Sequence, residues 1–109
     1  MNPLSLEYNF HNSKIYFSKK ELTKIFNCYF LGVSKANWKD YAIYFGNHKT
    51  SFYIFKHSSA SPECILTKSR VYKKNIIFYN LQIINKNEYK NKKIDNLIAI
   101  IKRNELKII

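Results

Sequence analysis

The chain contains few of the residues that interrupt or crosslink a fold. Its 109 residues include only two prolines, two glycines and two cysteines, and no linker, repeat or low-complexity stretch is present. A chain of this length has room for one domain, which buries roughly two thirds of the surface that the unfolded chain exposes. We therefore expect a single domain over residues 1–109, with residues 1–13 poorly ordered or irregular.

Reactive groups are also scarce. Cys28 and Cys64 show no C-x-x-C spacing, so we interpret both as small buried side chains rather than as a disulfide. The three histidines show no metal-ligand spacing, and the seven acidic residues are scattered. No nucleophile elbow, phosphate-binding glycine loop or zinc-protease motif occurs. These absences favour a non-enzymatic protein without a cofactor or a metal ion.

Long apolar runs are missing as well. The longest, at residues 76–84 and 97–101, are far shorter than the ~20 residues that span a bilayer. Residues 1–14 have neither the basic start nor the apolar core of a signal peptide. We expect a soluble cytoplasmic protein without a membrane partner.

Acidic residues are few relative to basic ones. Nineteen Lys and Arg residues against seven Asp and Glu give a net charge of +12. A positive field of this size favours an anionic partner. However, arginine occurs only twice while Lys, Asn and Ile are abundant, which is the composition that an AT-rich genome imposes on any surface. The charge is physically real, but it is weak support for nucleic-acid binding.

What the sequence does contain is an aromatic hairpin. Apolar side chains alternate with other residues from Tyr41 to Phe45 and again from Phe52 to Phe55. A period of two indicates β-strands, and aromatic and β-branched residues favour them. The break Gly46-Asn47-His48-Lys49 has the composition of a turn between antiparallel strands. The side chains that we expect to be buried here are Trp38, Ile43, Phe52 and Ile54.

A helix is predicted from Lys19 to Lys35. Ser18 can accept a hydrogen bond from the Glu21 amide while the Glu21 side chain reaches back to the Ser18 amide, which is a capping box. Phe17 before the cap can pack on Leu22, which is a hydrophobic staple. The capping pattern alone predicts that Glu21 contributes less to stability than Ser18. The apolar face of the helix is predicted to comprise Leu22, Ile25, Phe26, Tyr29 and Val33.

The end of this helix carries two further signals. Gly32 lies inside the predicted helix, where glycine has a mild cost. Asn37 follows it and is expected to end it in the left-handed conformation.

The remaining chain predicts two more strands and a second helix. Alternation over Glu63–Lys68 predicts the third strand, and β-branched and aromatic residues over Ile76–Asn85 predict the fourth. Apolar spacing predicts a helix over Lys92–Arg103, and Leu106–Ile109 alternates like a short strand. The fold class is therefore α+β: a helix, a four-stranded antiparallel meander and a helix, forming a single-layer sheet with helices on one face.

Several of these residues resemble a known family. They are Phe17, Lys20-Glu21-Leu22, Tyr29, the run from Trp38 to Ile43, Phe52-x-x-Phe55-Lys56, Ser58-Ser59 and Pro62. In order and spacing they resemble the alphaproteobacterial family known as domain of unknown function 2794, closely over Ile15–Lys68 and by pattern beyond. The chain departs from the family by carrying Phe30 and Ala36 where the family has glycine, and lysine where the family has arginine. The resemblance implies a bacterial, cytoplasmic, single-domain protein and brings no catalytic residue.

Two basic segments are candidates for nucleic-acid binding, RNA or DNA. The first comprises Lys68, Arg70, Tyr72, Lys73 and Lys74, and the second comprises Lys86, Lys90, Lys92 and Lys93 around Tyr89. Cations interleaved with an aromatic ring suit phosphate contacts and base stacking, although two solvated loops are an equally good interpretation. If both are loops at opposite ends of the fourth strand they lie ~30 Å apart, so their ligand must be extended.

A second hypothesis assigns the protein to a different class, that of protein-interaction modules. Tyr44, Tyr53 and Phe55 are expected to be half-exposed on the hairpin, where they could bind a protein partner or a second copy of the chain. Composition alone does not separate this hypothesis from nucleic-acid binding.

Overall fold

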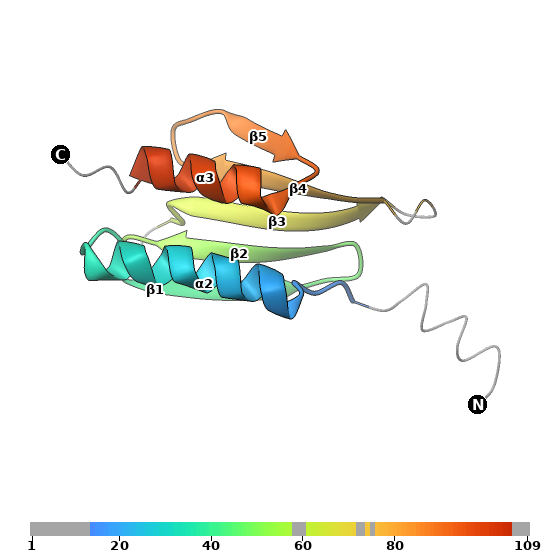
Figure 1. Ribbon diagram of the computed structural model, residues 1–109, viewed down its shortest axis with the longest axis horizontal. Helices are drawn as coiled ribbons and strands as arrows, with labels where there is room; N and C mark the ends of the chain where they lie inside the picture. Colours follow the sequence, from blue (N-terminus) through green and yellow to red (C-terminus); the bar gives the residue numbers. More distant parts are fainter. Residues whose placement is uncertain (1–13, 58–60, 72–73, 75, 106–109) are drawn as a thin grey trace.

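The computed structural model describes residues 14–57, 61–71, 74 and 76–105. The elements in chain order are α2 (Lys19–Ser34), β1 (Asp40–Phe45), β2 (Lys49–Phe55), β3 (Cys64–Val71), β4 (Ile76–Ile83), β5 (Glu88–Asn91) and α3 (Ile94–Glu105). Within the described residues the strands form one antiparallel sheet in the order β1-β2-β3-β4-β5 (Figure 1). The predicted α+β class is confirmed. The predictions for residues 1–13 and 106–109 lie outside the described residues.

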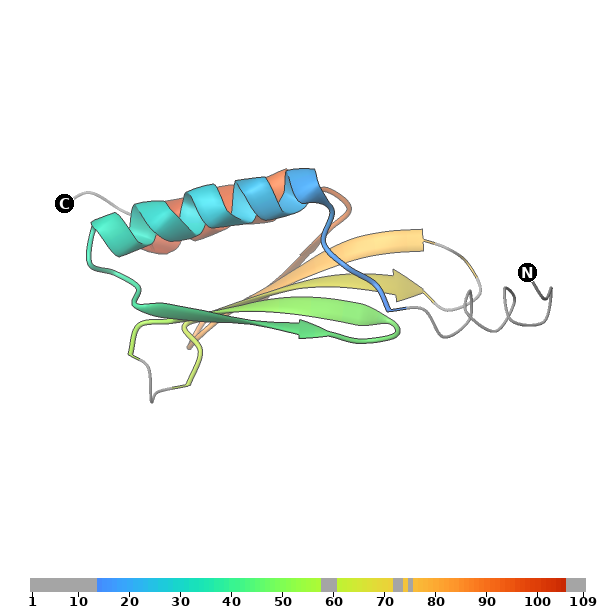
Figure 2. The same cartoon turned by 90° about the horizontal axis from the view of Figure 1, so that it is seen from below.

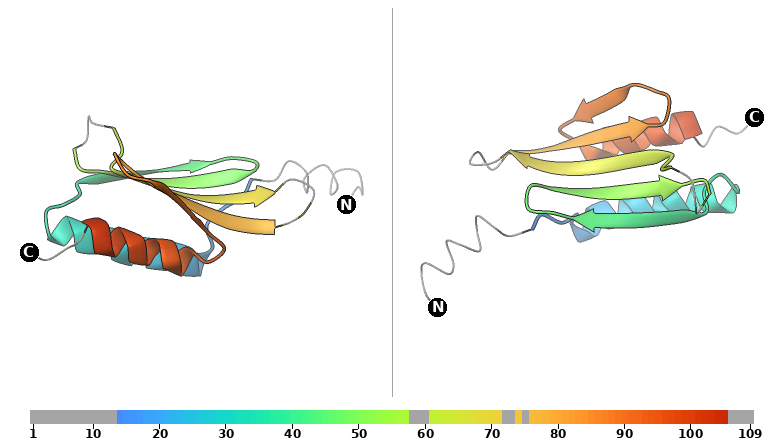
Figure 3. Two further views of the ribbon diagram at one scale, coloured as in Figure 1. Left: turned by 90° about the horizontal axis from the view of Figure 1, so that it is seen from above. Right: turned by 180° about the vertical axis from the view of Figure 1, so that it is seen from behind.

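The two helices cover one face of the sheet. Figure 2 shows both helices on the same side, and Figure 3 shows the opposite face of the strands without a helix in front of it. α3 contacts β4 and β5, and α2 packs beside α3. An exposed ion pair of 2.9 Å between Lys24 Nζ and Asp95 Oδ1 joins the two helices. For the part of the chain that the structure describes, the predicted one-sided arrangement is confirmed.

The predicted number of four strands is wrong, because the polar stretch after β4 forms β5. This strand pairs with β4 so that Tyr89 lies opposite Leu81 and Lys90 lies opposite Asn80. Only Tyr89 in this four-residue strand packs against the core. An edge strand with one inward apolar residue leaves no period-two pattern in the sequence, so the residue types did not reveal it.

The core lies between the sheet and the helices. Phe52, Leu66 and Leu81 lie next to one another in the register of β2, β3 and β4, and all three are fully buried. Leu97 of α3 is equally buried and belongs to the same cluster. The predicted burial of Trp38, Phe52 and Ile54 is confirmed, and Ile43 packs against the cluster.

The prediction that Val33 lies on the apolar face of the first helix is wrong. Val33 is exposed, whereas Gly32 is buried against the indole ring of Trp38. The Trp38 ring also stacks on Tyr29 of the same helix at a centroid distance of 6.3 Å. A Cβ atom at position 32 would overlap the indole ring, so the glycine allows the tryptophan to lie directly on the helix backbone.

We expect Gly32→Ala to destabilise the protein, even though alanine is the better helix former. Overlap with the indole should cost about 2–3 kcal/mol, which exceeds the ~1 kcal/mol gained in helix propensity. Chemical denaturation of the purified variant measures the difference. If the overlap is the cause, the double variant Gly32→Ala, Trp38→Leu should lose less stability than the sum of the two single changes. Additive losses would contradict this explanation.

The first helix ends one residue earlier than the sequence predicts. Lys35 is the C-cap, and Ala36 rather than Asn37 adopts the left-handed conformation, with φ of 60°. The amide of Ala36 donates to Val33 O and the amide of Asn37 donates to Gly32 O, both at 2.9 Å. These are the two hydrogen bonds of a Schellman motif, in which the left-handed position is normally glycine.

Ala36→Gly should therefore stabilise the protein by about 0.5–1 kcal/mol, because glycine adopts this conformation without the steric cost of a Cβ atom. The denaturation midpoint should rise. Ala99→Gly, the same change inside α3, is the matched control. It should lower the free energy of unfolding by about 1 kcal/mol and therefore lower the midpoint. A loss of stability in Ala36→Gly would contradict the assignment of strain to this residue.

Candidate nucleic-acid interface

The helix-free side of the sheet, called here the open face, is built by the residues that alternate with the buried ones. Phe52, Leu66 and Leu81 point toward the helices, so their strand neighbours point the other way. The larger apolar side chains placed on the open face in this way are Tyr44, Tyr53, Phe55, Ile65, Ile76 and Phe78. Tyr44 is 52% and Ile76 is 48% exposed, and the other four are half-buried.

The middle of the open face is polar. The hydroxyl groups of Ser51 and Thr67 are 2.9 Å apart and hydrogen bonded across β2 and β3. Asn80 of β4 lies opposite Thr67 and continues this row. Lys49 of β2 and Lys90 of β5 are exposed, and the same alternation places both of them on the open face. Aromatic rings, hydrogen-bonding groups and cations are therefore combined on one surface.

The first predicted basic segment is not a single loop. β3 continues to Val71, so Lys68 and Arg70 lie within the strand, and Lys74 is the exposed cation that the structure describes in the following turn. Arg70 is half-buried and its guanidinium Nη2 donates to Asn47 O at 2.8 Å in the β1–β2 turn. Tyr72 and Lys73, also predicted as site residues, lie outside the described residues.

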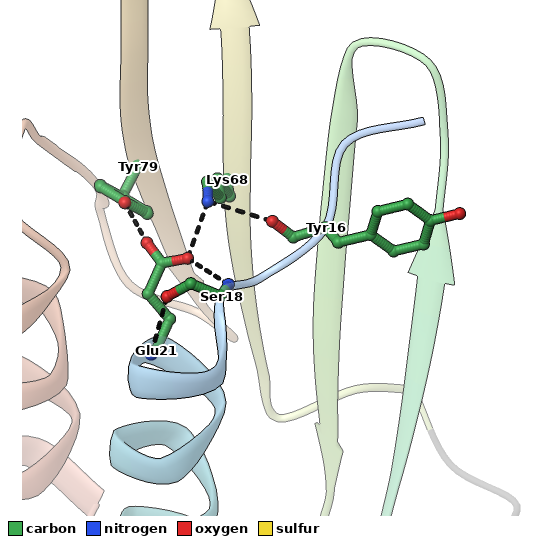
Figure 4. A network of polar contacts seen from close by, with 5 residues as sticks. All are labelled: Tyr16, Ser18, Glu21, Lys68 and Tyr79. Atoms are coloured by element: carbon green, nitrogen blue, oxygen red, sulfur yellow. Dashed lines mark hydrogen bonds and ion pairs between the residues drawn. The ribbon is translucent and has the colours of Figure 1, made fainter. Parts of the chain in front are cut away.

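Lys68 lies on the opposite, helix-covered side of the sheet. Its ammonium group is 2.7 Å from Glu21 Oε1, and the two side chains are only 14% and 12% exposed. Lys68 also donates to the carbonyl oxygen of Tyr16 at 3.0 Å. Glu21 accepts further hydrogen bonds from the Ser18 amide and from the Tyr79 hydroxyl (Figure 4). The predicted capping box is confirmed, and the same carboxylate joins α2 to β3 and β4.

The surroundings of Glu21 keep its carboxylate ionised beside Lys68. Burial alone raises the pKa of Glu21, but hydrogen bonds from Lys68, Tyr79 and the Ser18 amide outweigh burial and lower the pKa below its ordinary value of 4.5. Burial, and then the hydrogen bond and the charge of Glu21, raise the pKa of Tyr79, which therefore keeps its proton and donates. Lys68 is thus engaged inside the protein.

We expect Glu21→Gln to cost about 3 kcal/mol, more than the ~1 kcal/mol for Ser18→Ala, because the ammonium of Lys68 loses its buried counter-charge. This order is the reverse of the one that the capping pattern predicts. Because the pKa of Glu21 is lowered on folding, its contribution is present above about pH 4.5 and is lost as the pH falls through the folded value.

Denaturation of both variants between pH 7 and pH 2 tests this expectation. The loss of stability on acidification should be smaller in Glu21→Gln than in the wild type, whereas Ser18→Ala should keep most of it. A Glu21→Gln variant no less stable than Ser18→Ala would contradict the role of the carboxylate in holding Lys68.

The second predicted basic segment is also not a loop. Lys86 lies in the β4–β5 turn, and its amide donates to Ile83 O at 3.0 Å. Lys90 lies on β5 opposite Asn80, in the middle of β4, and Lys92 and Lys93 precede α3. All four are exposed, but only Lys86 lies at the far end of β4 from Lys74. The ~30 Å separation estimated for the two segments therefore applies to Lys86 alone.

Sequence reasoning missed two residues of the open face, Phe78 and Lys49. Phe78 lies between Ile77 and Tyr79, which both pack on the core side, and Lys49 lies opposite Ser69 of β3. Their orientation follows from strand alternation once the strand register is known. Tyr89, in contrast, was expected among the cations of a loop but packs on the core side.

The described residues hold no group of three or more His, Cys, Asp or Glu side chains placed to bind a metal ion. Among them, neither helix is long and apolar enough to cross a membrane. Cys28 and Cys64 are both buried, as predicted, and no disulfide joins them.

The fold and this surface define a small, basic α+β protein with one helix-covered and one open sheet face. Residues 15–96 match the family described as Protein of unknown function (DUF2794), and the chain belongs to this family. The resemblance found in the sequence is thereby confirmed. No curated protein and no solved structure matches the chain. The family supplies no activity, so a functional proposal has to rest on the surface itself.

Proposed function

We propose that the protein binds single-stranded nucleic acid, with RNA as the first candidate, on the open face of its sheet. The observation that carries the proposal is the presence of Tyr44, Tyr53, Phe55 and Phe78 on a helix-free face of a chain with a net charge of +12. The bases of a single strand are free to lie on aromatic rings, and each such contact contributes ~1–3 kcal/mol.

The charges around the open face support an extended anionic ligand. β2, β3 and β4 contain no acidic residue, and Lys49 and Lys90 project from the face itself, while the acidic residues Asp40 and Glu88 lie on the two edge strands. Lys74 and Lys86 lie near the two ends of β4, whose eight residues span ~26 Å. A phosphate backbone crossing the strands could contact several of these cations, while a compact anion could not.

The polar row in the middle of the face suits the same ligand. Thr67 and Asn80 are half-buried polar groups between Tyr53 of β2 and Phe78 of β4, and Ser51, only 3% exposed, holds the Thr67 hydroxyl in place. Base edges and ribose hydroxyl groups need such partners when they leave water. The proposal therefore replaces two basic loops by one surface on which stacking, hydrogen bonding and phosphate binding occur together.

A cytoplasmic setting is part of the proposal. Cys28 and Cys64 are not joined by a disulfide, which suits a reducing compartment. Burial raises the pKa of the Cys28 thiol to about 11, so this group stays protonated and unreactive at neutral pH.

Fluorescence anisotropy with labelled single-stranded RNA, single-stranded DNA and duplex at several salt concentrations tests the proposal. Tyr44→Ala should weaken binding of single strands by ~5-fold or more, because one base then has no ring to stack on. Tyr16→Ala is the matched control: Tyr16 is equally exposed, at 54%, but packs on Phe45 on the other side of the sheet, so its removal should leave binding unchanged.

Charge reversal separates a site from the overall field. Lys74→Glu with Lys90→Glu should lower the slope of log affinity against log salt by ~0.7 for every phosphate group that these lysines neutralise. Lys20→Glu with Lys102→Glu changes the net charge equally but on the helices, and should change the slope less. If the two double variants changed the slope equally, binding would depend on the net charge alone, and the assignment of the open face would be overturned. Absence of binding by the wild type at low salt would instead favour a protein partner at the same aromatic residues.

A further inference from the structure

The two edges of the sheet differ in a way that nucleic-acid binding does not explain. β5 has four residues, including Glu88 and Lys90, and short charged edge strands resist pairing with other chains. β1 has six residues, and from Tyr41 to Phe45 it contains no charged residue and no proline. It also pairs with β2 in an unbroken register. Among the described residues, no strand pairs with the other side of β1. The segment before α2 contacts the end of this strand, where the Ile15 amide donates to Gly46 O at 2.9 Å and Tyr16 packs on Phe45.

The outer side of β1 presents backbone groups in a regular order. Gly46 N donates to Lys49 O at the end of the hairpin. Because hydrogen-bonded and non-bonded pairs alternate along an antiparallel ladder, the amide and carbonyl groups of Tyr41, Ile43 and Phe45 point away from β2. Consistent with this, the Tyr41 amide donates to the side chain of Asp40 at 2.8 Å instead of to a strand.

An apolar groove runs beside this edge, between β1 and α2. It has a volume of about 630 Å³, and its lining includes Leu22, Phe26, Phe30 and Tyr41. Phe30 is 58% exposed, and Tyr41 and Phe45 are 42% and 40% exposed. Exposed rings of this size next to an open strand edge are typical of a surface that another polypeptide covers.

We propose that two copies of the chain associate through antiparallel pairing of their β1 strands about a two-fold axis at Ile43. In this register Ile43 lies opposite Ile43 of the second copy, and Tyr41 lies opposite Phe45 of the second copy on the helix-covered side. Each outward amide and carbonyl group of these residues then has a partner. The two α2 helices approach across the groove, so that Phe30 of each copy is covered.

The second copy fits better than other occupants because the edge is complementary to itself. Pairing β1 with β5 of another copy would leave a free edge at each end, so that copies would add without limit. The charged residues of β5 also oppose this pairing. Centring the pair on Ala42 would place Tyr44 opposite Asp40, and Phe45 would have no aromatic residue of the second copy opposite it. Centring it on Ile43 forms the Tyr41–Phe45 contact twice.

The net charge of +12 on each copy opposes association, whereas β1 itself is uncharged between Tyr41 and Phe45. Screening by salt should therefore strengthen the dimer, because it weakens the repulsion between the copies. Binding of nucleic acid should weaken under the same change. Added salt should therefore strengthen the dimer and weaken nucleic-acid binding, so either proposal can fail without the other.

Sedimentation of the full chain over a range of concentrations, at low and high salt and without nucleic acid, tests the dimer. The wild type should show twice the mass of one chain, with tighter association at high salt. Phe30→Lys should raise the dimer dissociation constant by ~10-fold or more, as expected for an aromatic residue buried at an interface. Leu31→Lys is the matched control, since Leu31 is 41% exposed on the same helix and does not line the groove.

Ile43→Pro is a second variant that addresses the strand edge. The amide that it removes is one that points away from β2, so the hairpin keeps its own hydrogen bonds while the edge is blocked. Circular dichroism verifies that the variant is folded. A wild type that stays monomeric at every concentration and salt would overturn the proposal. So would a dimer that Phe30→Lys and Leu31→Lys weaken equally, or that neither Phe30→Lys nor Ile43→Pro weakens.

Discussion

The buried carboxylate of Glu21 is the interaction on which the arrangement of the layers depends. It receives hydrogen bonds from the start of its own helix, from Lys68 of β3 and from Tyr79 of β4. A charge in this position is tolerated only because all of its partners are present at once. Together with the close contact between Gly32 and Trp38 at the other end of α2, this polar network fixes where the helix lies along the sheet.

With both helices committed to one side, the sheet has a second side that none of the described residues in a helix or strand covers. The residue types on that side differ from those of an ordinary solvated face, because aromatic rings surround a polar row. A surface of this kind is typical of a binding face, which is the basis of the proposed function. The proposed ligand and the proposed dimer use different parts of the molecule, the open face and the β1 edge, so they are compatible.

Local signals in the sequence were sufficient for much of the fold. The cap at Ser18, the hairpin around Gly46 and the inward residue Phe52 were all predicted, since each depends on neighbours within a few positions. β5 and the left-handed Ala36 were not predicted, because tertiary packing rather than residue type decides both. The candidate site was harder still. Lys68 is the last residue of the predicted third strand and continues the inward alternation of Cys64 and Leu66, so its orientation was within reach of the sequence, but its partner Glu21 lies 47 residues away.

The strictly consecutive order of the strands has a consequence for how the chain folds. Each strand pairs only with its neighbours in sequence, so the sheet can grow hairpin by hairpin without closing a long loop. α2 precedes the sheet in the chain, yet its carboxylate finds its last partner 58 residues later, at Tyr79. During synthesis the first helix can pack on the β1–β2 hairpin, but its carboxylate lacks Tyr79 until β4 has left the ribosome, and the side that packs on α3 is uncovered for longer still. In this interval the nascent chain is most exposed to aggregation and to chaperones.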